Sequence, residues 1–338
     1  MRDREEGGGV DRRLVLRRLG QAGLIVGASG TLAGLGALSP GRWRAERAAE
    51  TIRDHAVPAD ARWPALAIAR GPGPGRLVRA AIEAVGGIER FVRPGETVLL
   101  KPNMAWDRTV EQGANTHPAV VAEVARLCLE ARAGRVLVAE VPVHDASRVA
   151  QRSGILAAAL AAGAQVIIPP GSGFTRTALS GSVLDYWEVF SPLLDADRVI
   201  NLPVVKDHAL TRFTCGLKNW YGLLGGTRAR LHQEIHQSIA DLAVAMRPTL
   251  TVVDASRVMV RGGPTGGRLE DVVAMNVVAA GTDPVALDAW GASLLNLDPR
   301  EIPHIVLAEG RGLGSIAAGS GPLKEISVGA VGGRDAGA

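Results

Sequence analysis

Short apolar runs alternate with segments of helical periodicity from Trp63 onwards. The first runs predict strands over 65–71, 96–103, 135–141 and 165–170, with helices over 76–92, 116–132 and 154–164. A second set predicts strands over 198–205, 249–255 and 324–331, with helices over 231–246 and 284–295. Such alternation is typical of βαβ units on a mostly parallel sheet. The expected fold class is α/β: a layered, mostly parallel (mixed) sheet with helices on both faces.

The N-terminal segment has a different pattern. Arg12 and Arg13 precede a Gly/Ala-rich apolar stretch that ends at Leu38, and a basic segment follows it. This arrangement resembles a twin-arginine (Tat) export signal, which is an address and not folded structure. We therefore expect a Tat-type signal or anchor and linker over residues 1–55, and one α/β domain over 60–330. The protein would meet the Tat translocation machinery and work in the periplasm or another extracytoplasmic place.

Cleavage of that leader stays open. The apolar run is roughly twenty residues long, which is enough for a short membrane anchor. Attachment to a membrane through an uncleaved leader is therefore an alternative to release.

The distribution of charge argues against nucleic-acid binding, and the cysteine content argues against a Cys-ligated cluster. The chain of 338 residues has a net charge of +4, but ten arginines against seven acids lie in residues 1–55, which leaves 28 cations and 27 acids elsewhere. Without a basic stripe in the body, we expect no nucleic-acid binding. Cys128 and Cys215 are too few for a Cys-ligated iron–sulfur cluster in this chain. Cys128 lies on the apolar side of a predicted helix and is expected in the core.

Lysine is rare in this chain. Among 38 Lys and Arg residues, the four lysines are Lys101, Lys206, Lys218 and Lys324. Lysine carries a compact ammonium group whose pKa changes on burial, whereas the guanidinium of arginine is planar and permanently charged. In a chain that otherwise uses arginine, each lysine therefore indicates a position where a compact ammonium group is needed. Lys101, Lys206 and Asp254 lie at the carboxyl ends of predicted strands. The carboxyl ends of strands are where open α/β sheets bind ligands.

The segment from Lys206 to Asn219 is the densest polar cluster in an apolar context. Lys206 and His208 precede Lys218 and Asn219 by about a dozen residues, and Trp220 follows them. A solvated loop is one interpretation. Apolar neighbours favour the other, in which buried ammonium groups need an anion and act as a base or an electrostatic clamp.

A helix start lies near Lys101 in the sequence. The segment from Asn115 to Pro118, which contains Thr116 and His117, opens a helix with a capping residue and a proline. If Lys101 faces the free N–H groups there, the two form an oxyanion site. An ordinary turn and a helix cap are the alternative.

Three further features are ambiguous from the sequence. His232 and His236 have the i, i+4 spacing of a metal-binding pair on one helix, although an exposed histidine pair is the commoner explanation of that spacing. Gly263 lies in a glycine-rich turn that permits close approach to a ligand, or in a surface loop. Asp283 and Asp288 either cap a helix or pair with the lysines.

Taken in order, these motifs resemble the DUF362 family, a group of unknown function. The resemblance rests on KPN, NTHP, the stretch from Val199 to Gly226, the turn from Asp254 to Gly263, and GTDPVALDAW, and it spans roughly residues 65–312. Many family members also carry CxxC clusters of ferredoxin type, and this chain has none. The resemblance implies a shared site at Lys101, Asn103, His117, Lys206, His208, Lys218, Asn219, Asp254, Gly263, Asp283, Pro284 and Asp288.

The leading hypothesis is an enzyme for a small anionic substrate, with proton-transfer or group-transfer chemistry. Its catalytic residues would be Lys206, His208 and Lys218. Its substrate-binding residues would be Lys101, Asn103, Thr116, His117, Asn219, Asp254, Gly263, Asp283 and Asp288. The competing hypothesis is a non-catalytic protein that binds or assembles a metal or redox cofactor for iron–sulfur systems. No cofactor is named by the sequence.

Overall fold

The computed structural model describes residues 49–169, 172–320 and 323–329. The chain divides into residues 1–48 and 49–338, and the fold below is that of the second unit. The arginine pair of the predicted export signal lies outside the described residues. Within the described part, the helices are too short or too polar to cross a bilayer.

The large sheet of this unit has ten strands. Its main path runs β13-β2-β12-β11-β8-β3-β4-β5, while β9 pairs with β11 and β10 pairs with β9. The strands are β2 (Leu66–Arg70), β3 (Thr97–Pro102), β4 (Arg135–Ala139), β5 (Gln165–Ile167), β8 (Arg198–Leu202), β9 (Val204–His208), β10 (Arg212–Thr214), β11 (Leu250–Met259), β12 (Val272–Gly281) and β13 (Lys324–Ser327).

Most neighbours in this sheet are parallel. The run β11-β8-β3-β4-β5 is parallel throughout, and β9 also pairs parallel to β11. The strand β12 is antiparallel to both β2 and β11, and β10 is antiparallel to β9. The predicted fold class is confirmed: a mostly parallel, mixed α/β sheet.

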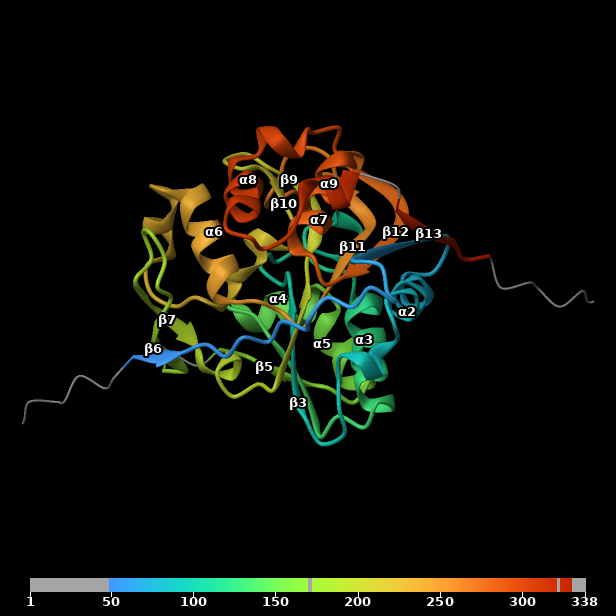
Figure 1. Cartoon of the computed structure of the whole chain (residues 1–338), viewed down its shortest axis with the longest axis horizontal. Coiled ribbons are helices and arrows are strands. Elements are labelled where there is room, and N and C mark those ends of the chain that lie inside the picture. The colour runs from blue at the N-terminus through green and yellow to red at the C-terminus, as the bar shows by residue number, and fades with distance from the viewer. Residues whose placement is uncertain (1–48, 170–171, 321–322, 330–338) are drawn as a thin grey trace, which may run out of the picture. The chain divides into compact units, whose positions relative to one another are not determined.

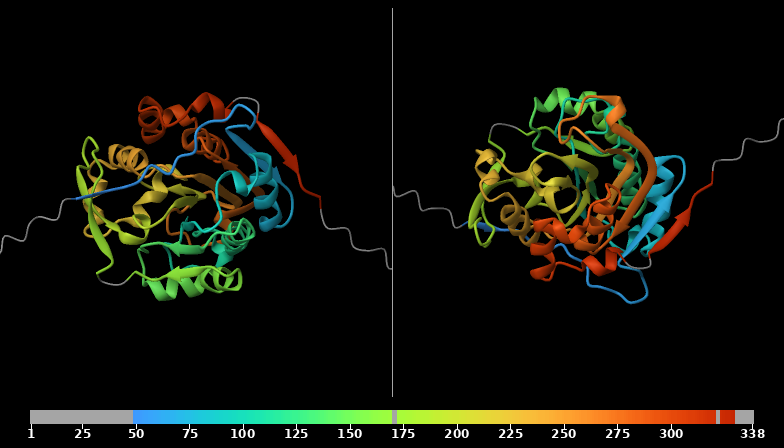
Figure 2. Two further views of the ribbon diagram at one scale, coloured as in Figure 1. Left: turned by 60° about the horizontal axis from the view of Figure 1, so that its bottom comes forward. Right: turned by 90° about the horizontal axis from the view of Figure 1, so that it is seen from above.

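Helices cover both faces of the sheet (Figures 1 and 2). One apolar core joins α2, α3, α4 and α5 to the sheet, and the other joins α6, α7, α8 and α9 to its opposite face. Their bounds are α2 (Pro74–Ala84), α3 (Pro118–Glu130), α4 (Ala146–Arg152), α5 (Ile155–Ala161), α6 (Ile235–Ala245), α7 (Pro284–Ser293), α8 (Pro303–Gly310) and α9 (Ile316–Ser320). The alternation along β3 shows the division: Leu99 packs into the second core, whereas Val98 and Leu100 pack into the first.

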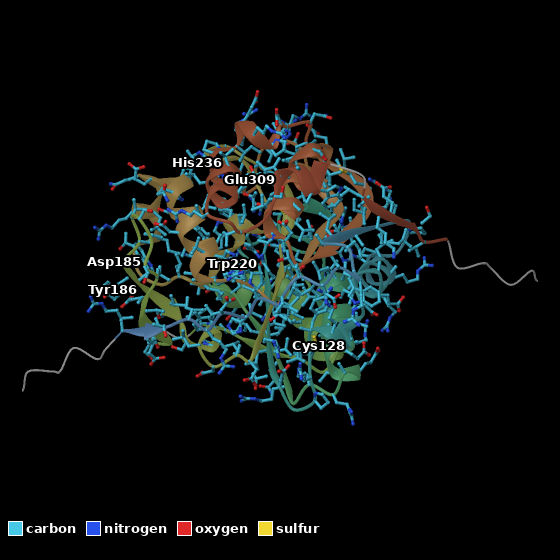
Figure 3. All side chains as sticks on the ribbon, in the orientation of Figure 1. Cys128, Asp185, Tyr186, Trp220, His236 and Glu309 are labelled. Carbon is cyan, nitrogen blue, oxygen red and sulfur yellow. The ribbon has the colours of Figure 1, made fainter. Side chains whose placement is uncertain are left out.

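Short 3₁₀ helices connect these elements. They are η1 (Ile88–Arg90), η2 (Val110–Gln112), η3 (Ser191–Leu193), η4 (Leu217–Leu223), η5 (Arg228–His232), η6 (Leu269–Asp271) and η7 (Pro299–Glu301). Trp220 of η4 is buried near the centre of the second core, and Cys128 lies on the apolar side of α3 as predicted (Figure 3).

A smaller sheet has the order β1-β6-β7. Its strands are β1 (Glu50–Thr51), β6 (Phe174–Ala178) and β7 (Tyr186–Phe190). The segment after β1 is held to the domain, because Arg53 pairs with Asp197 at 3.0 Å and Arg247 pairs with Asp54 at 2.7 Å. The described fold thus begins inside the range that the sequence assigned to leader and linker.

Two predicted strand boundaries are wrong in a way that matters for the site. The strand predicted over 198–205 is two strands, β8 and β9, divided at Pro203, and β9 continues to His208. The strand predicted to end at 255 continues to Met259. Lys206 and Asp254 therefore lie inside strands and not at their carboxyl ends. Lys101 is the last residue but one of β3, at its carboxyl end as predicted.

Candidate active site

A cavity of about 380 Å³ lies beside the carboxyl ends of β3 and β4, between β9 and η4. Its volume falls in the range of small-molecule sites, which is roughly 300–1,000 Å³. Apolar residues form part of its wall. The polar residues that line it are Asn103, Glu140, Lys206, His208, Thr214, Lys218, Asn219, Tyr221, Arg228 and His232.

Strand alternation brings Lys206 and His208 to the same cavity. Successive side chains of a strand point to opposite faces, so these two share a face, while Val205, which precedes Lys206, packs into the second core. The antiparallel partner β10 places Thr214 opposite Lys206. The buried Oγ1 of Thr214 has no hydrogen-bond partner among the described residues, so a bound ligand could supply one.

Lys206 is almost fully buried, with 1% of its surface exposed. Its Nζ donates to Asn103 Oδ1 at 3.1 Å and to the carbonyl oxygen of Ala114 at 2.5 Å. Burial, followed by the nearby charge of Lys218, lowers the pKa of Lys206 to about 7. A neutral amine has two N–H donors and one lone pair. Since both acceptors are neutral oxygens, Lys206 can satisfy them as the free amine and keep its lone pair for a proton.

His208 has a fixed role as a hydrogen-bond donor. Its Nδ1 accepts from the backbone N–H of Leu210 at 3.1 Å and lies 3.4 Å from that of Thr211. The ring proton of the neutral imidazole is therefore on Nε2. Burial, with the charges of Lys218 and Lys206, lowers the pKa of His208 to about 3. At neutral pH this side chain donates a hydrogen bond and is a poor base.

Two further cations line the cavity without a carboxylate partner. Lys218 lies over the ring of Tyr221, with Nζ 5.1 Å from its centroid, and burial lowers its pKa to about 8. Arg228 donates to the carbonyl oxygens of Val141 at 2.7 Å and Pro142 at 2.8 Å. Within the ranges that the structure describes, neither cation forms a salt bridge. Their charge is available to a ligand.

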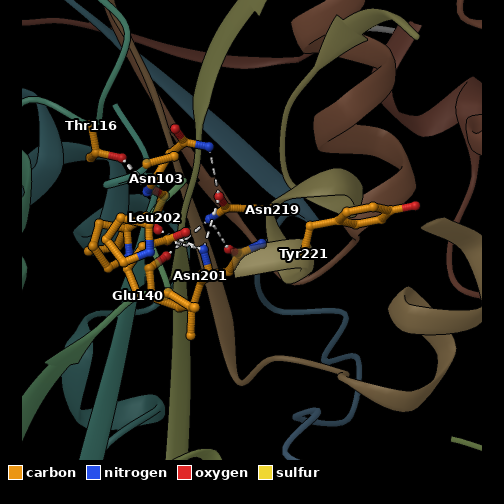
Figure 4. A network of polar contacts seen from close by, with 12 residues as sticks. Asn103, Thr116, Glu140, Asn201, Leu202, Asn219 and Tyr221 are labelled. Atoms are coloured by element: carbon orange, nitrogen blue, oxygen red, sulfur yellow. Dashed lines mark hydrogen bonds and ion pairs between the residues drawn. The ribbon is translucent and has the colours of Figure 1, made fainter. Parts of the chain in front are cut away.

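An asparagine network connects Lys206 to a buried ion pair (Figure 4). Asn103 accepts from Lys206 and donates through Nδ2 to Asn219 Oδ1 at 3.1 Å. The same oxygen of Asn219 accepts from Lys101 Nζ at 3.2 Å, and Lys101 forms a salt bridge with Glu140. Asn219 Nδ2 donates to Asn201 Oδ1 at 2.8 Å. These bonds fix both amides, so Asn103 presents its oxygen to Lys206.

Strand register explains why Lys101 meets Glu140. The parallel strands β3 and β4 pair Leu100 with Val138, so the residues just beyond come side by side at the same edge. Burial lowers the pKa of Lys101 and raises that of Glu140, while the attraction between them opposes both shifts. Gly222 packs against this pair so closely that an added Cβ would lie 1.8 Å from Glu140 Oε1.

The anion site predicted between Lys101 and the start of α3 is wrong. A protein carboxylate occupies that helix start: the backbone N–H of His117 donates to Asp254 Oδ2 at 2.7 Å. Thr116 Oγ1 donates to the carbonyl oxygen of Leu202 at 2.7 Å and accepts from the backbone N–H of Asn103. These residues hold α3 against the sheet, and Lys101 turns to Glu140 instead.

The family model described as "Domain of unknown function (DUF362)" matches residues 98–293. This chain belongs to the DUF362 family. A curated relative, the thylakoid-associated protein sll1697 of Synechocystis sp. (strain ATCC 27184 / PCC 6803 / Kazusa), is 32% identical over 250 residues, which are 71% of this chain and 76% of that protein.

Solved structures resemble the chain more distantly. The lactate racemase apoprotein from Thermoanaerobacterium thermosaccharolyticum is 12% identical with a TM-score of 0.40, over 70% of this chain and 58% of that one. A protein from Thermotoga maritima is 10% identical with a TM-score of 0.36, over 66% of this chain and 58% of that one. The chain thus spans less than two thirds of either.

The remaining residues expected from the DUF362 pattern support the site from outside it. Asp288 accepts from the backbone N–H groups of Gly216 at 2.7 Å and Leu217 at 3.2 Å, and so holds the start of η4. Burial raises the pKa of Asp288 to about 7. Asp283 caps α7 by accepting from Ala286 N–H at 2.8 Å. Neither carboxylate pairs with a lysine, so of the two alternatives the helix cap is the one found, at Asp283.

Gly263 of this DUF362 member is required by a close backbone approach. Its N–H donates to Asp207 Oδ2 at 3.0 Å, and an added Cβ would lie 1.7 Å from the Asp207 carbonyl oxygen. Pro264, which follows, lines the cavity. The glycine therefore lets this loop close one side of the site.

The histidine pair expected on one helix is divided between two elements. His232 ends η5 and lies 6.4 Å from the ring of Tyr221, whereas His236 lies in α6 and its Nδ1 is 3.1 Å from Nδ1 of His304. Among described residues, no cluster of three His, Cys, Asp or Glu side chains is placed to hold a metal ion. The prediction of a shared helix face is wrong.

Glu140, Gly222 and Arg228 are among the cavity residues that the sequence analysis missed. Glu140 directly follows β4 and could have been found by the strand-end rule that selected Lys101. Gly222 lies in the motif YGLLGG, but it has no functional group that would mark it as a site residue. Arg228 is one of many arginines, and no local pattern separates it from those on the surface.

Proposed function

We propose that this DUF362 protein is an enzyme that binds a small anionic substrate in the cavity and transfers a proton through Lys206. The observation that carries the proposal is the charge of the lining. Lys206, Lys218 and Arg228 border one cavity, and within the described residues none of them forms a salt bridge. Since burying unpaired charge is costly, such a cavity favours an anionic occupant.

Each polar group has a role in this proposal. Lys218 and Arg228 hold the anion, and His208 donates a hydrogen bond from Nε2. Lys206 accepts the proton, because a pKa of about 7 leaves much of it as the free amine at neutral pH. The charge of the bound anion favours the ammonium form, so it stabilises Lys206 once that amine has accepted the proton.

The asparagine network and the Lys101–Glu140 pair position these groups in this proposal. Asn103 keeps its oxygen toward Lys206 because Asn219 accepts from its Nδ2. Glu140 forms its salt bridge with Lys101, and it acts on Lys206 and Arg228 only through longer-range attraction.

Binding of inorganic phosphate and acetate, measured by calorimetry, tests the anion site. Lys218→Gln should weaken binding about tenfold or more, since hydrogen bonds to charged groups contribute about 1.5–3 kcal/mol. Lys324→Gln removes an exposed lysine of β13 and should bind as the unaltered protein does. Equal binding by all three proteins would contradict the proposal.

Proton transfer is tested on the anion that co-purifies with the protein, identified by mass spectrometry. Its conversion should fall about 10²-fold or more in Lys206→Met, the usual loss for a general base. Stoichiometric metal or cofactor in the native protein, with no conversion of any anion, would favour the competing hypothesis of a cofactor-binding or assembly protein.

We also propose export by the Tat route, on the basis of Arg12 and Arg13 ahead of the apolar leader. The related sll1697 is named as thylakoid-associated. Localisation of the present chain at a membrane would agree with that name and with an uncleaved leader.

A further inference from the structure

The lining of the cavity changes character from its buried end to its exposed end. The buried residues are polar: Lys206, Thr214 and Asn219 are between 1% and 3% exposed. The exposed residues of the lining are mostly apolar: Val143 is 57% and Leu210 59% exposed, Ala229 is exposed as well, and His232 is the polar exception. The cavity thus has a polar floor and a mostly apolar rim.

The apolar rim comes from three separate segments. Leu210 belongs to the turn between β9 and β10, Val143 to the loop after β4, and Pro264 to the loop beside Asp207. Trp106, which follows β3, adds an aromatic ring whose edge meets His144, with ring centroids 5.2 Å apart. Scattered exposed apolar residues are ordinary on a protein surface. Here, however, the exposed apolar residues lie together at the mouth of one cavity.

The size of the cavity is also informative. A water molecule occupies about 30 Å³ in the liquid, so a cavity of about 380 Å³ corresponds to roughly a dozen waters. A phosphate ion or a two-carbon acid would fill only a small part of it. The rest of the space lies against the apolar wall, where water gains little hydrogen bonding.

We infer that the substrate is an amphipathic anion, with its charged head on the polar floor and an apolar body that extends past Trp106 to Val143 and Leu210. This inference rests on the proposed function, since it assigns the head to Lys206, Lys218 and Arg228. The charged head is a carboxylate or a phosphate. The apolar body is a chain or ring that the rim removes from water.

Three probes of matched design separate the two ends of the ligand: acetate, octanoate and octan-1-ol. Each methylene removed from water contributes about 0.8 kcal/mol, which is about a fourfold gain in affinity per carbon. Octanoate should therefore bind the full-length protein at least 100-fold more tightly than acetate. Octanol, which lacks the charge, should bind at least tenfold more weakly than octanoate.

The chain offers a matched pair of exposed leucines as variant and control. Leu210→Ser should lower octanoate affinity several-fold and leave acetate affinity unchanged. Leu269→Ser alters a leucine that is 60% exposed, equal to Leu210 in this respect, but it lies in η6 and does not line the cavity. That control should bind both acids as the unaltered protein does.

The outcomes distinguish the two proposals. Equal affinity for acetate and octanoate would overturn the amphipathic substrate and leave the anion site standing. Equal affinity for octanol and octanoate would overturn the anion site instead. No binding of any probe at millimolar concentration would overturn both.

Discussion

Lys206 is the residue on which most of the chemistry depends. The scarcity of lysine indicated that it is special, and the structure gives the physical reason: an ammonium group held by two neutral oxygens where burial opposes charge. The sequence could not show which lysine pairs with a carboxylate. Glu140 pairs with Lys101 and not with Lys206, and that follows only from the register of β3 and β4.

Lys206 should make stability depend on pH. Its folded pKa of about 7 is below its ordinary value of 10.5, so the native state must bury the charge below pH 7, and that cost disappears as pH rises from about 7 to 10.5. Between pH 6 and pH 9, the free energy of unfolding should rise in the unaltered protein relative to Lys206→Met by on the order of 2 kcal/mol.

Urea unfolding at the two pH values measures this difference. Lys324→Met is the control, because its exposed side chain should leave the pH dependence unchanged. If the difference in free energy of unfolding between the unaltered protein and Lys206→Met stays constant from pH 6 to pH 9, Lys206 titrates at an ordinary pKa.

At the scale of elements, the local hydrophobic pattern predicted the parallel strands. It did not predict the strands whose existence or ends depend on tertiary contacts. The strands β2, β3, β4 and β5 and the helices beside them were predicted. No strand was predicted over 272–281, although β12 pairs there with both β2 and β11. An apolar run of that length is ambiguous between strand and buried helix. The division at Pro203 was also missed, and with it the placement of Lys206 and His208 inside β9.

The position of η4 against β4 should depend on Gly222. Gly222→Ala would place a methyl group in contact with Glu140, so the pair with Lys101 must shift, and we expect a loss of about 1–3 kcal/mol in unfolding free energy, the usual cost of overpacking. Binding of phosphate should weaken as well, because η4 carries Lys218 and Asn219.

Gly310→Ala is the matched glycine control. No atom outside its immediate neighbours lies within 4 Å of a Cβ added to Gly310, which ends α8. Alanine there should leave stability unchanged or slightly raised, because it favours helix over glycine. Equal stability of the two alanine variants would contradict the close packing described for Gly222.

For the whole molecule, the leader remains a prediction. Replacing Arg12 and Arg13 with lysine keeps the charge but removes the twin-arginine pair, so the precursor should accumulate in the cytoplasm of its native host. Arg17 and Arg18 form a second arginine pair in the same leader and, replaced by lysine, serve as the control. Cell fractionation with an antibody measures both, and normal export of the Arg12/Arg13 variant would rule out the Tat route.

The central claim is that one cavity combines a lysine of near-neutral pKa with unpaired cations that attract an anion. With four lysines in the chain, protein labelled with ¹³C at lysine Cε gives few NMR signals, and each is assigned by its loss in a Lys→Met variant. We predict that the Lys206 signal titrates near pH 7 and that saturating octanoate moves its midpoint upward. A Lys206 midpoint near the ordinary value of 10.5, unmoved by octanoate, would contradict the account.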